Sequence, residues 1–169
     1  MNLNYHELIP ADFSPDSRVW IYQSARIFFI QEALQIEEKL NAFVDEWHSH
    51  GAPVKGYANL FFGQFIVLMA DEQATGVSGC STDSSVRLMK EMEHVYKVNL
   101  FDRLSLAFLV KGKIQTIPMT QLDYAIQNSF ISPDTLYLNN TVQTKDQLMN
   151  NWMIPVKESW LANRLKFEV

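Results

Sequence analysis

Cysteine, glycine and proline are all scarce in this chain. Its 169 residues include one cysteine, six glycines and six prolines. A single cysteine excludes an internal disulfide, and the first residues show no basic start followed by an apolar run, so we expect a reducing, cytoplasmic location. Hydrophobic residues make up 47% of the chain, which together with so little glycine and proline excludes a fibrous or disordered protein.

Positive charge is also in short supply. The chain has 14 Lys and Arg residues against 19 Asp and Glu residues, a formal net charge of -5. Nucleic acids and anionic membrane surfaces are bound mainly through Lys and Arg, so we expect neither as a partner. The most apolar stretch, residues 57–70, is interrupted by Asn59, Gly63 and Gln64 and is shorter than the ~20 residues of a membrane-spanning helix. The expected partner is an unknown protein or small molecule.

The spacing of apolar residues predicts a mixture of strands and helices. In chain order these are a strand at 18–23, a helix at 30–47, strands at 54–62 and 65–70, a helix at 84–97, strands at 104–110 and 114–118, a helix at 120–127, a strand at 136–138 and a helix after Thr144. Gly63 and Gln64 suit a two-residue type II′ turn. The order predicts an α+β fold with a ferredoxin-like split βαβ core, in which both helices cover one face of a mostly antiparallel sheet, plus an extra hairpin strand and a C-terminal helical extension.

A single domain is expected over residues 1–169, with a core at about 18–118 and an extension at about 119–169 packed on it. Trp152 and Trp160 indicate that this extension is pinned to the core, because each buries a large apolar area. The strands around Gly63 are almost continuously apolar, which indicates that both of their faces are covered. The helices supply one cover. The other is either the C-terminal segment or a second subunit, so a homodimer is one hypothesis.

The candidate site is the segment from Gly79 to Ser85, which holds the only cysteine and leads into a predicted helix. Cys80 is a candidate nucleophile, because a helix N-terminus favours a thiolate. Its base would be His48 or His50, which the antiparallel helices bring close, or else His6. His94 lies roughly 16 Å away along the helix and is excluded. The alternative is a small buried side chain, since Asp83 raises the pKa of a nearby thiol and free cysteines are often buried.

Hydroxyl side chains surround Cys80 and suggest two roles. With the helix N-H groups they can form an anion-binding nest, or they can simply cap the helix, with Asp83 or Thr82 as the N-cap. The candidate ligand-binding residues are Ser81, Thr82, Asp83, Ser84, Ser85 and Arg87.

Three other groups of residues have a functional and a structural interpretation. His48-Ser49-His50 has metal-compatible types, but a histidine is favoured at a helix C-terminus anyway, and we expect no metal and no cofactor. The acidic pairs at 45–46 and 71–72 are expected on the solvated surface. An aromatic cluster either lines a ligand cavity or, as we expect, packs in the core. It consists of Tyr57, Phe61, Phe62 and Phe65.

Four segments together resemble a family of small uncharacterised bacterial proteins. They are Ser78-Gly79-Cys80-Ser81-Thr82-Asp83-Ser84-Ser85, residues 18–24, and the pair of segments at 151–155 and 158–161. The likeness spans most of the chain. Members sometimes carry the label "ABC transporter ATPase", but the chain lacks the Gly-x-x-x-x-Gly-Lys-Ser/Thr phosphate loop that such ATPases need. Its one Gly-Lys pair, at residues 112–113, is followed by Ile114 in a predicted hairpin. The resemblance implies no catalytic role.

Two functional hypotheses follow. The first is a soluble, non-catalytic domain that binds a ligand or partner through the Gly79 to Ser85 segment. The second is a thiol-dependent enzyme in which Cys80 attacks a substrate, His48 or His50 acts as base, and the N-H groups of Ser84 and Ser85 stabilise negative charge.

Overall fold

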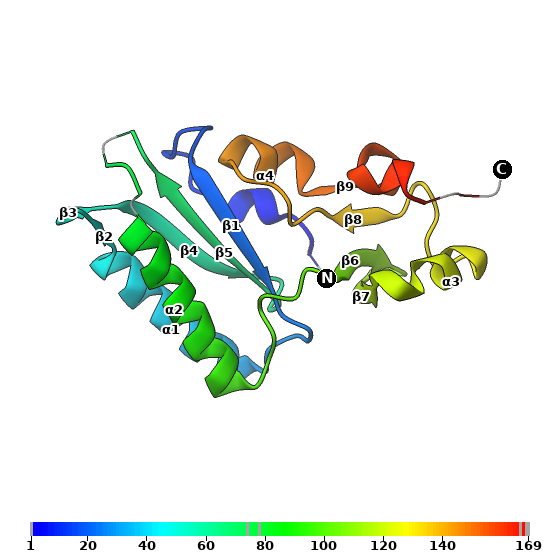
Figure 1. Ribbon diagram of the computed structural model, residues 1–169, viewed down its shortest axis with the longest axis horizontal. Coiled ribbons are helices and arrows are strands. Elements are labelled where there is room, and N and C mark those ends of the chain that lie inside the picture. The colour runs from blue at the N-terminus through cyan, green and yellow to red at the C-terminus, as the bar shows by residue number, and fades with distance from the viewer. Residues whose placement is uncertain (1, 74, 78, 166, 168–169) are drawn as a thin grey trace.

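Figure 1 shows the fold of the chain in a computed structural model that describes residues 2–73, 75–77, 79–165 and 167, with only the backbone of Cys80. Two antiparallel sheets lie end to end, each accompanied by helices, so the α+β prediction is confirmed. No helix in the described ranges combines the length and the apolar character needed to cross a lipid bilayer.

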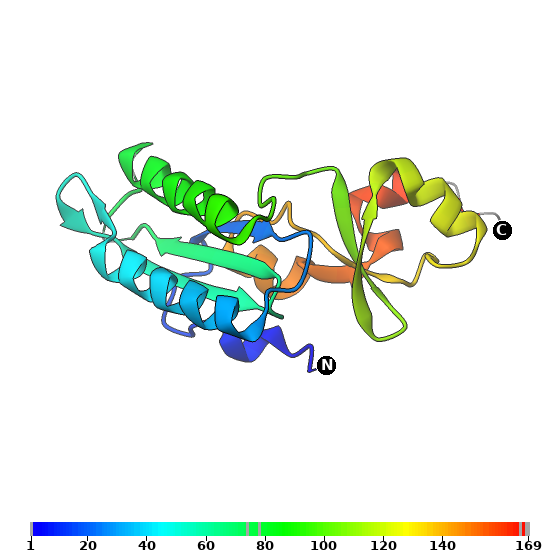
Figure 2. The same ribbon diagram turned by 90° about the horizontal axis from the view of Figure 1, so that it is seen from below.

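The first sheet has three strands in the order β1-β5-β4. They are β1 (Arg18–Gln23), β4 (Lys55–Phe61) and β5 (Phe65–Asp71), accompanied by the helices α1 (Ile30–Glu46) and α2 (Gly79–Tyr96), the short hairpin β2 (His48–Ser49) and β3 (Ala52–Pro53), and the 3-10 turn η1 (Tyr5–Leu8). Figure 2 shows α1 and α2 running along the same side of this sheet.

The second sheet has four strands in the order β7-β6-β8-β9. They are β6 (Ser105–Val110), β7 (Lys113–Pro118), β8 (Leu136–Leu138) and β9 (Met153–Pro155), accompanied by the helices α3 (Leu122–Gln127) and α4 (Lys145–Asn151) and the 3-10 turns η2 (Met119–Gln121), η3 (Val156–Glu158) and η4 (Trp160–Asn163). We expected residues 104–118 to extend the first sheet. They instead pair with strands from the C-terminal part of the chain.

The central strand β5 is buried along its whole length because its two faces meet two different cores. Ile66 and Leu68 face α1 and α2, whose buried residues include Leu40 and Met89. Side chains alternate across a strand, so Val67 and its neighbours on the same face point the opposite way. The continuous apolar run is therefore explained by cover on both faces, as predicted.

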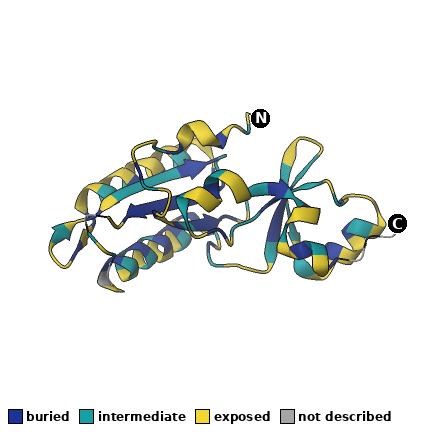
Figure 3. Cartoon of the chain, turned by 90° about the horizontal axis from the view of Figure 1, so that it is seen from above, coloured by how far each residue is buried: buried dark blue, intermediate teal, exposed yellow. Residues whose placement is uncertain are grey.

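The cover on the second face comes from the chain itself. Trp152 is fully buried and packs against Phe61 and Phe65 of the first sheet, and Tyr5 of η1 joins the same cluster. Figure 3 shows the buried residues concentrated along the strands between these layers. The alternative that the sequence left open is thus decided in favour of the terminal segments, and β5 needs no second subunit to cover it.

Three local predictions are corrected by the structure. The second helix begins at Gly79 rather than near Ser84, so the segment expected to be a loop forms the first turns of α2. The loop between β4 and β5 spans residues 62–64 with Phe62 and Gly63 both at positive φ, instead of a two-residue type II′ turn. Asp71, expected on the surface, is buried at the end of β5, where it accepts hydrogen bonds from the N-H groups of Ser14 and Gln73 at 3.0 and 3.1 Å.

Candidate functional site

The start of α2 holds the residues that the sequence singled out. Ser81 and Ser85 are buried, Thr82 and Ser84 are half-buried, and Asp83 is exposed. All five lie inside the helix, so neither Thr82 nor Asp83 is its N-cap. The side chain of Cys80 lies outside the described part of the structure, so its role as a nucleophile stays a prediction.

The Ser85 side chain is buried and bonds within the protein. Its hydroxyl donates to the carbonyl of Thr82 at 2.7 Å, one turn earlier in the helix. Burial raises the pKa of Tyr22 on β1, and the nearby Ser85 hydroxyl acts in the opposite direction. Arg87 follows two residues further along α2 and is exposed. At least one hydroxyl of the predicted anion nest therefore stabilises the fold.

The end of α1 does approach the start of α2, as the ferredoxin-like prediction required. The contact is made by Trp47, whose indole N-H donates to the Ser81 carbonyl at 3.1 Å. His48 and His50 follow Trp47 and are both exposed. The Nδ1 atom of His48 lies 2.6 Å from the Glu46 carbonyl, and His50 occupies the turn of the small hairpin at φ 50°. No described group of three or more His, Cys, Asp or Glu side chains is arranged to hold a metal ion.

The aromatic cluster predicted to be core packs in the core. Phe61 and Phe65 are fully buried, and Tyr57 and Phe62 pack against them from partly buried positions. Phe62 stacks on Trp152 with their rings 5.8 Å apart and nearly parallel. Tyr57 also lines a hollow between β4 and α1.

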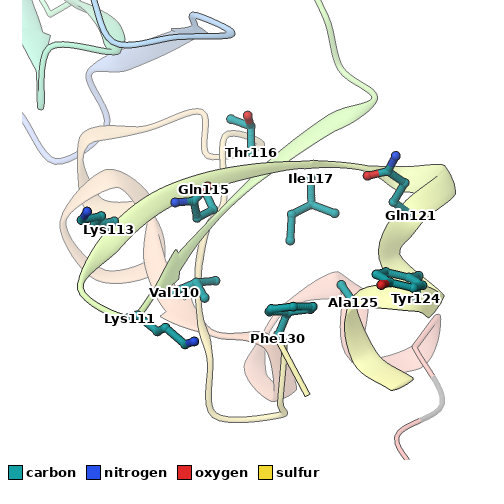
Figure 4. A pocket seen from close by; sticks show the side chains of 10 residues that line it. All are labelled: Val110, Lys111, Lys113, Gln115, Thr116, Ile117, Gln121, Tyr124, Ala125 and Phe130. Carbon is teal, nitrogen blue, oxygen red and sulfur yellow. The ribbon is translucent and has the colours of Figure 1, made fainter. Parts of the chain in front are cut away.

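A groove that the sequence did not indicate lies on the second sheet, between the β6–β7 hairpin and α3. Figure 4 shows the side chains that surround it, and its volume is about 550 Å³. Val110, Ile117 and Ala125 are among its apolar lining, and Gln115, Thr116 and Gln121 supply polar groups. We call this hollow the β7–α3 groove. Its size and mostly apolar surface are typical of small-molecule sites.

Two lysines stand at one end of the β7–α3 groove. Lys111 and Gly112 have φ values of 51° and 73°, which close a two-residue turn of type I′ between Val110 and Lys113. The turn places Lys111 and Lys113 at the tip of the hairpin, as Figure 4 shows. Both are exposed, neither forms an ion pair with a described residue, and no acid lines the groove.

Two aromatic side chains form the wall on the other side. Tyr124 projects from α3 with 64% of its surface exposed, and Phe130 is 47% exposed. Phe130 is held by the end of the helix, because its N-H donates to the Ala125 carbonyl at 2.8 Å and the N-H of Ser129 donates to Ile126 at 2.9 Å. This is a Schellman turn with Ser129 at φ 59°, the position at which glycine is usual.

The only sequence signals for this groove are weak. Tyr124 interrupts the polar face of a short helix, and Phe130 stands beside Ile131 in a loop flanked by polar residues. Single exposed aromatics are common on protein surfaces, so neither predicts a site by itself. Comparison of the chain with protein-family models, with curated proteins and with solved structures finds no match.

Proposed function

We propose that this chain is a non-catalytic binding domain, and that it holds a small amphipathic anion in the β7–α3 groove. Such a ligand has an apolar body and a carboxylate or phosphate head. The observation that carries the proposal is the pairing of an apolar floor with two lysines that lack an acidic partner among the described residues. In a chain of net charge -5, such a local excess of positive charge favours an anion over a cation.

One end of the groove would bind the apolar body of the ligand, and the other end would bind its anionic head group. The apolar body would contact Ile117, Tyr124 and Phe130, where removal of apolar surface from water supplies most of the affinity. The head group would lie between Lys111 and Lys113, where each ammonium donates hydrogen bonds to anionic oxygen. Because both lysines are exposed, each contributes modestly, about 0.2–1 kcal/mol. The charge therefore selects the ligand, and the apolar wall holds it.

The test uses three probes with the same ten-carbon chain: decanoate, decyl phosphate and the uncharged decanol. Binding is followed by titration calorimetry and by amide shifts in two-dimensional NMR. We expect both anions to bind several-fold tighter than decanol and to shift the amides of residues 110–130. The stronger of the two anions identifies the head group.

Charge-neutral variants show whether the lysines are responsible. K111Q/K113Q removes both charges of the groove, and we expect it to weaken decanoate about fivefold while leaving decanol unchanged. K90Q/K97Q is the matched control, because it removes two exposed lysines of which Lys97, like Lys111, has a positive φ. The proposal is refuted if decanoate fails to bind or if both double variants weaken it equally.

Finer features of the fold and the location remain proposals. The order β1-β5-β4 with two helices on one face supports a ferredoxin-like core that lacks its fourth strand in the sheet. The single cysteine supports a cytoplasmic location, and self-association of the chain stays a prediction.

A further inference from the structure

The outer edge of the first sheet is open at β4. This strand pairs with β5 and, among the described strands, with no other. Beside it lies a hollow of about 730 Å³ whose walls are α1, with Glu37 and Asp45, and η1, with Leu8. We call this hollow the β4 slot. It is separate from the β7–α3 groove, which lies on the second sheet.

The backbone of β4 directs alternate residues into the slot. The N-H of Leu60 donates to the side-chain oxygen of Asn59 at 2.8 Å, so it points away from β5. Alternate residues of an antiparallel strand point their N-H and C=O groups to the same side. Gly56 and Ala58 therefore point outward with Leu60, and no described residue outside the sheet takes up their backbone groups.

The opposite edge of the sheet confirms this alternation. On β1 the N-H of Val19 turns outward and donates to the Gln143 carbonyl at 2.9 Å. Arg18, Trp20 and Tyr22 must then bond to β5, which leaves Val67 and its alternate neighbours on β5 to bond to β4. The chain thus covers the start of the edge at β1, whereas the edge at β4 has no such bond among the described residues. Such an edge is a ready template for an added strand.

The α1 wall of the β4 slot is negatively charged. Glu37 and Asp45 are both exposed, and neither has a cation within ion-pair distance in the described ranges. A second copy pairing antiparallel through β4 would bring its own α1 alongside and place four carboxylates together. Like charges so placed disfavour the pairing. A strand with Lys or Arg side chains directed at α1 meets no such repulsion.

We infer that the β4 slot binds an extended basic segment of another protein by adding it as a fourth strand to the first sheet. Main-chain hydrogen bonds to Gly56, to Ala58 and to the carbonyl of Leu60 supply affinity, and alternate side chains supply selectivity. Basic side chains face Glu37 and Asp45, while the side chains between them face Leu8.

The test uses two seven-residue probes, acetyl-Val-Lys-Val-Lys-Val-Lys-Val-amide and the same peptide with Glu in place of Lys. Amide shifts in NMR give the location and the affinity. We expect the lysine peptide to shift residues 55–61 and to bind about tenfold tighter than the glutamate peptide, with an affinity that falls as salt is added. Absence of binding by the lysine peptide at millimolar concentration would overturn the inference.

Two variants separate strand addition from simple attraction between charges. A58P removes only an outward N-H, and proline is tolerated on an edge strand at such a position. We expect it to weaken the lysine peptide about tenfold, with an unchanged circular dichroism spectrum. E37Q/D45N should weaken binding about fivefold, whereas the matched pair E38Q/E46Q, on α1 but outside the slot, should not.

The same variants define the contradicting results. Equal weakening by E37Q/D45N and E38Q/E46Q would mean that the peptide follows the general negative charge of the chain. Full binding to a folded A58P protein would rule out the added strand. Sedimentation of the free chain as a dimer that A58P dissociates would show that a second copy fills the slot, and would also overturn the inference.

Discussion

Trp152 joins the two halves of the molecule, and its replacement tests that role. The side chain is fully buried and meets four aromatic rings, with Tyr5 at 4.9 Å and Phe65 at 5.4 Å in edge contacts. Its indole N-H donates to the side-chain oxygen of Asn140 at 2.9 Å. One residue thus contacts the first sheet, η1 and the loop that precedes α4.

The cost of Trp152→Ala is estimated from these contacts. Truncation of a buried Trp to Ala costs about 3–5 kcal/mol through lost transfer energy and the cavity that remains. Loss of the bond to Asn140 adds about 1 kcal/mol, the lower end of the range, because Asn140 is only half-buried and water can reach it. The sum, about 4–6 kcal/mol, is a large part of the roughly 5–15 kcal/mol that stabilises a typical domain.

Urea unfolding followed by far-ultraviolet circular dichroism measures this change, and two variants calibrate it. Trp152→Phe keeps most of the ring packing and should cost about 1–2 kcal/mol. Trp160→Ala removes a tryptophan that is 41% exposed and should also cost only about 1–2 kcal/mol. A loss below about 2 kcal/mol for Trp152→Ala, or equal losses at both tryptophans, would refute the role assigned to Trp152.

Two further predictions concern the first sheet. The hydrogen bond from the Ser14 N-H is the main cause that lowers the pKa of the Asp71 carboxyl, so Asp71→Asn should lower the free energy of unfolding by about 1–2 kcal/mol at pH 7. Because the pKa of Asp71 is lower in the folded state than in the unfolded state, this stability difference should shrink as the pH falls below about 4. A constant difference down to about pH 2.5 would contradict the assignment. A methyl group on Gly56 would lie 2.7 Å from the Trp47 ring, whereas one on Gly76 would meet no atom within 4 Å. Urea unfolding should show that Gly56→Ala lowers the free energy of unfolding by about 1–3 kcal/mol and Gly76→Ala by less than about 0.5 kcal/mol. Equal losses for the two variants would argue against close packing at Gly56.

Local patterns predicted most of the elements but not the partners of the strands. The helix α1 and the hairpin of β4 and β5 follow from apolar spacing, which is a property of neighbouring residues. The position of β6 depends on which strands it pairs with, and one of them, β8, is far away in the sequence. In the structure the Gln143 carbonyl accepts the outward N-H of Val19 on β1, and β6 pairs with β8 and β7 instead of with β1. No pattern within residues 104–110 predicts these pairing partners.

The start of α2 shows how packing outweighs a composition signal. Ser, Thr and Asp are favoured at N-caps, so a run of them predicts that a helix begins at its end. In the structure the helix begins at Gly79, before the run, and the carbonyl of the buried Ser81 accepts the indole N-H of Trp47. The burial of Asp71 was likewise not predicted. Its carboxylate accepts hydrogen bonds from the N-H groups of Gln73 and Ser14, and Ser14 is far away in the sequence.

The β7–α3 groove depended on backbone conformations that the residue types do not suggest. Lys111 and Ser129 both adopt positive φ, where Gly or Asn would be the usual signal. The first conformation holds the lysines at the hairpin tip, and the second holds Phe130 at the rim. Both are maintained by hydrogen bonds that form only once the hairpin and α3 are in place.

The groove and the β4 slot carry charges of opposite sign on different sheets, and this separates their ligands. The anion that we propose for the groove would meet the like charge of Glu37 in the slot, and the basic strand that we infer for the slot would meet the like charge of Lys113 in the groove. The two ligands therefore cannot substitute for one another, although each would respond to salt. The K111Q/K113Q variant should leave the lysine peptide unaffected, and E37Q/D45N should leave decanoate unaffected. Each pair of substitutions thus serves as the folding control for the other site.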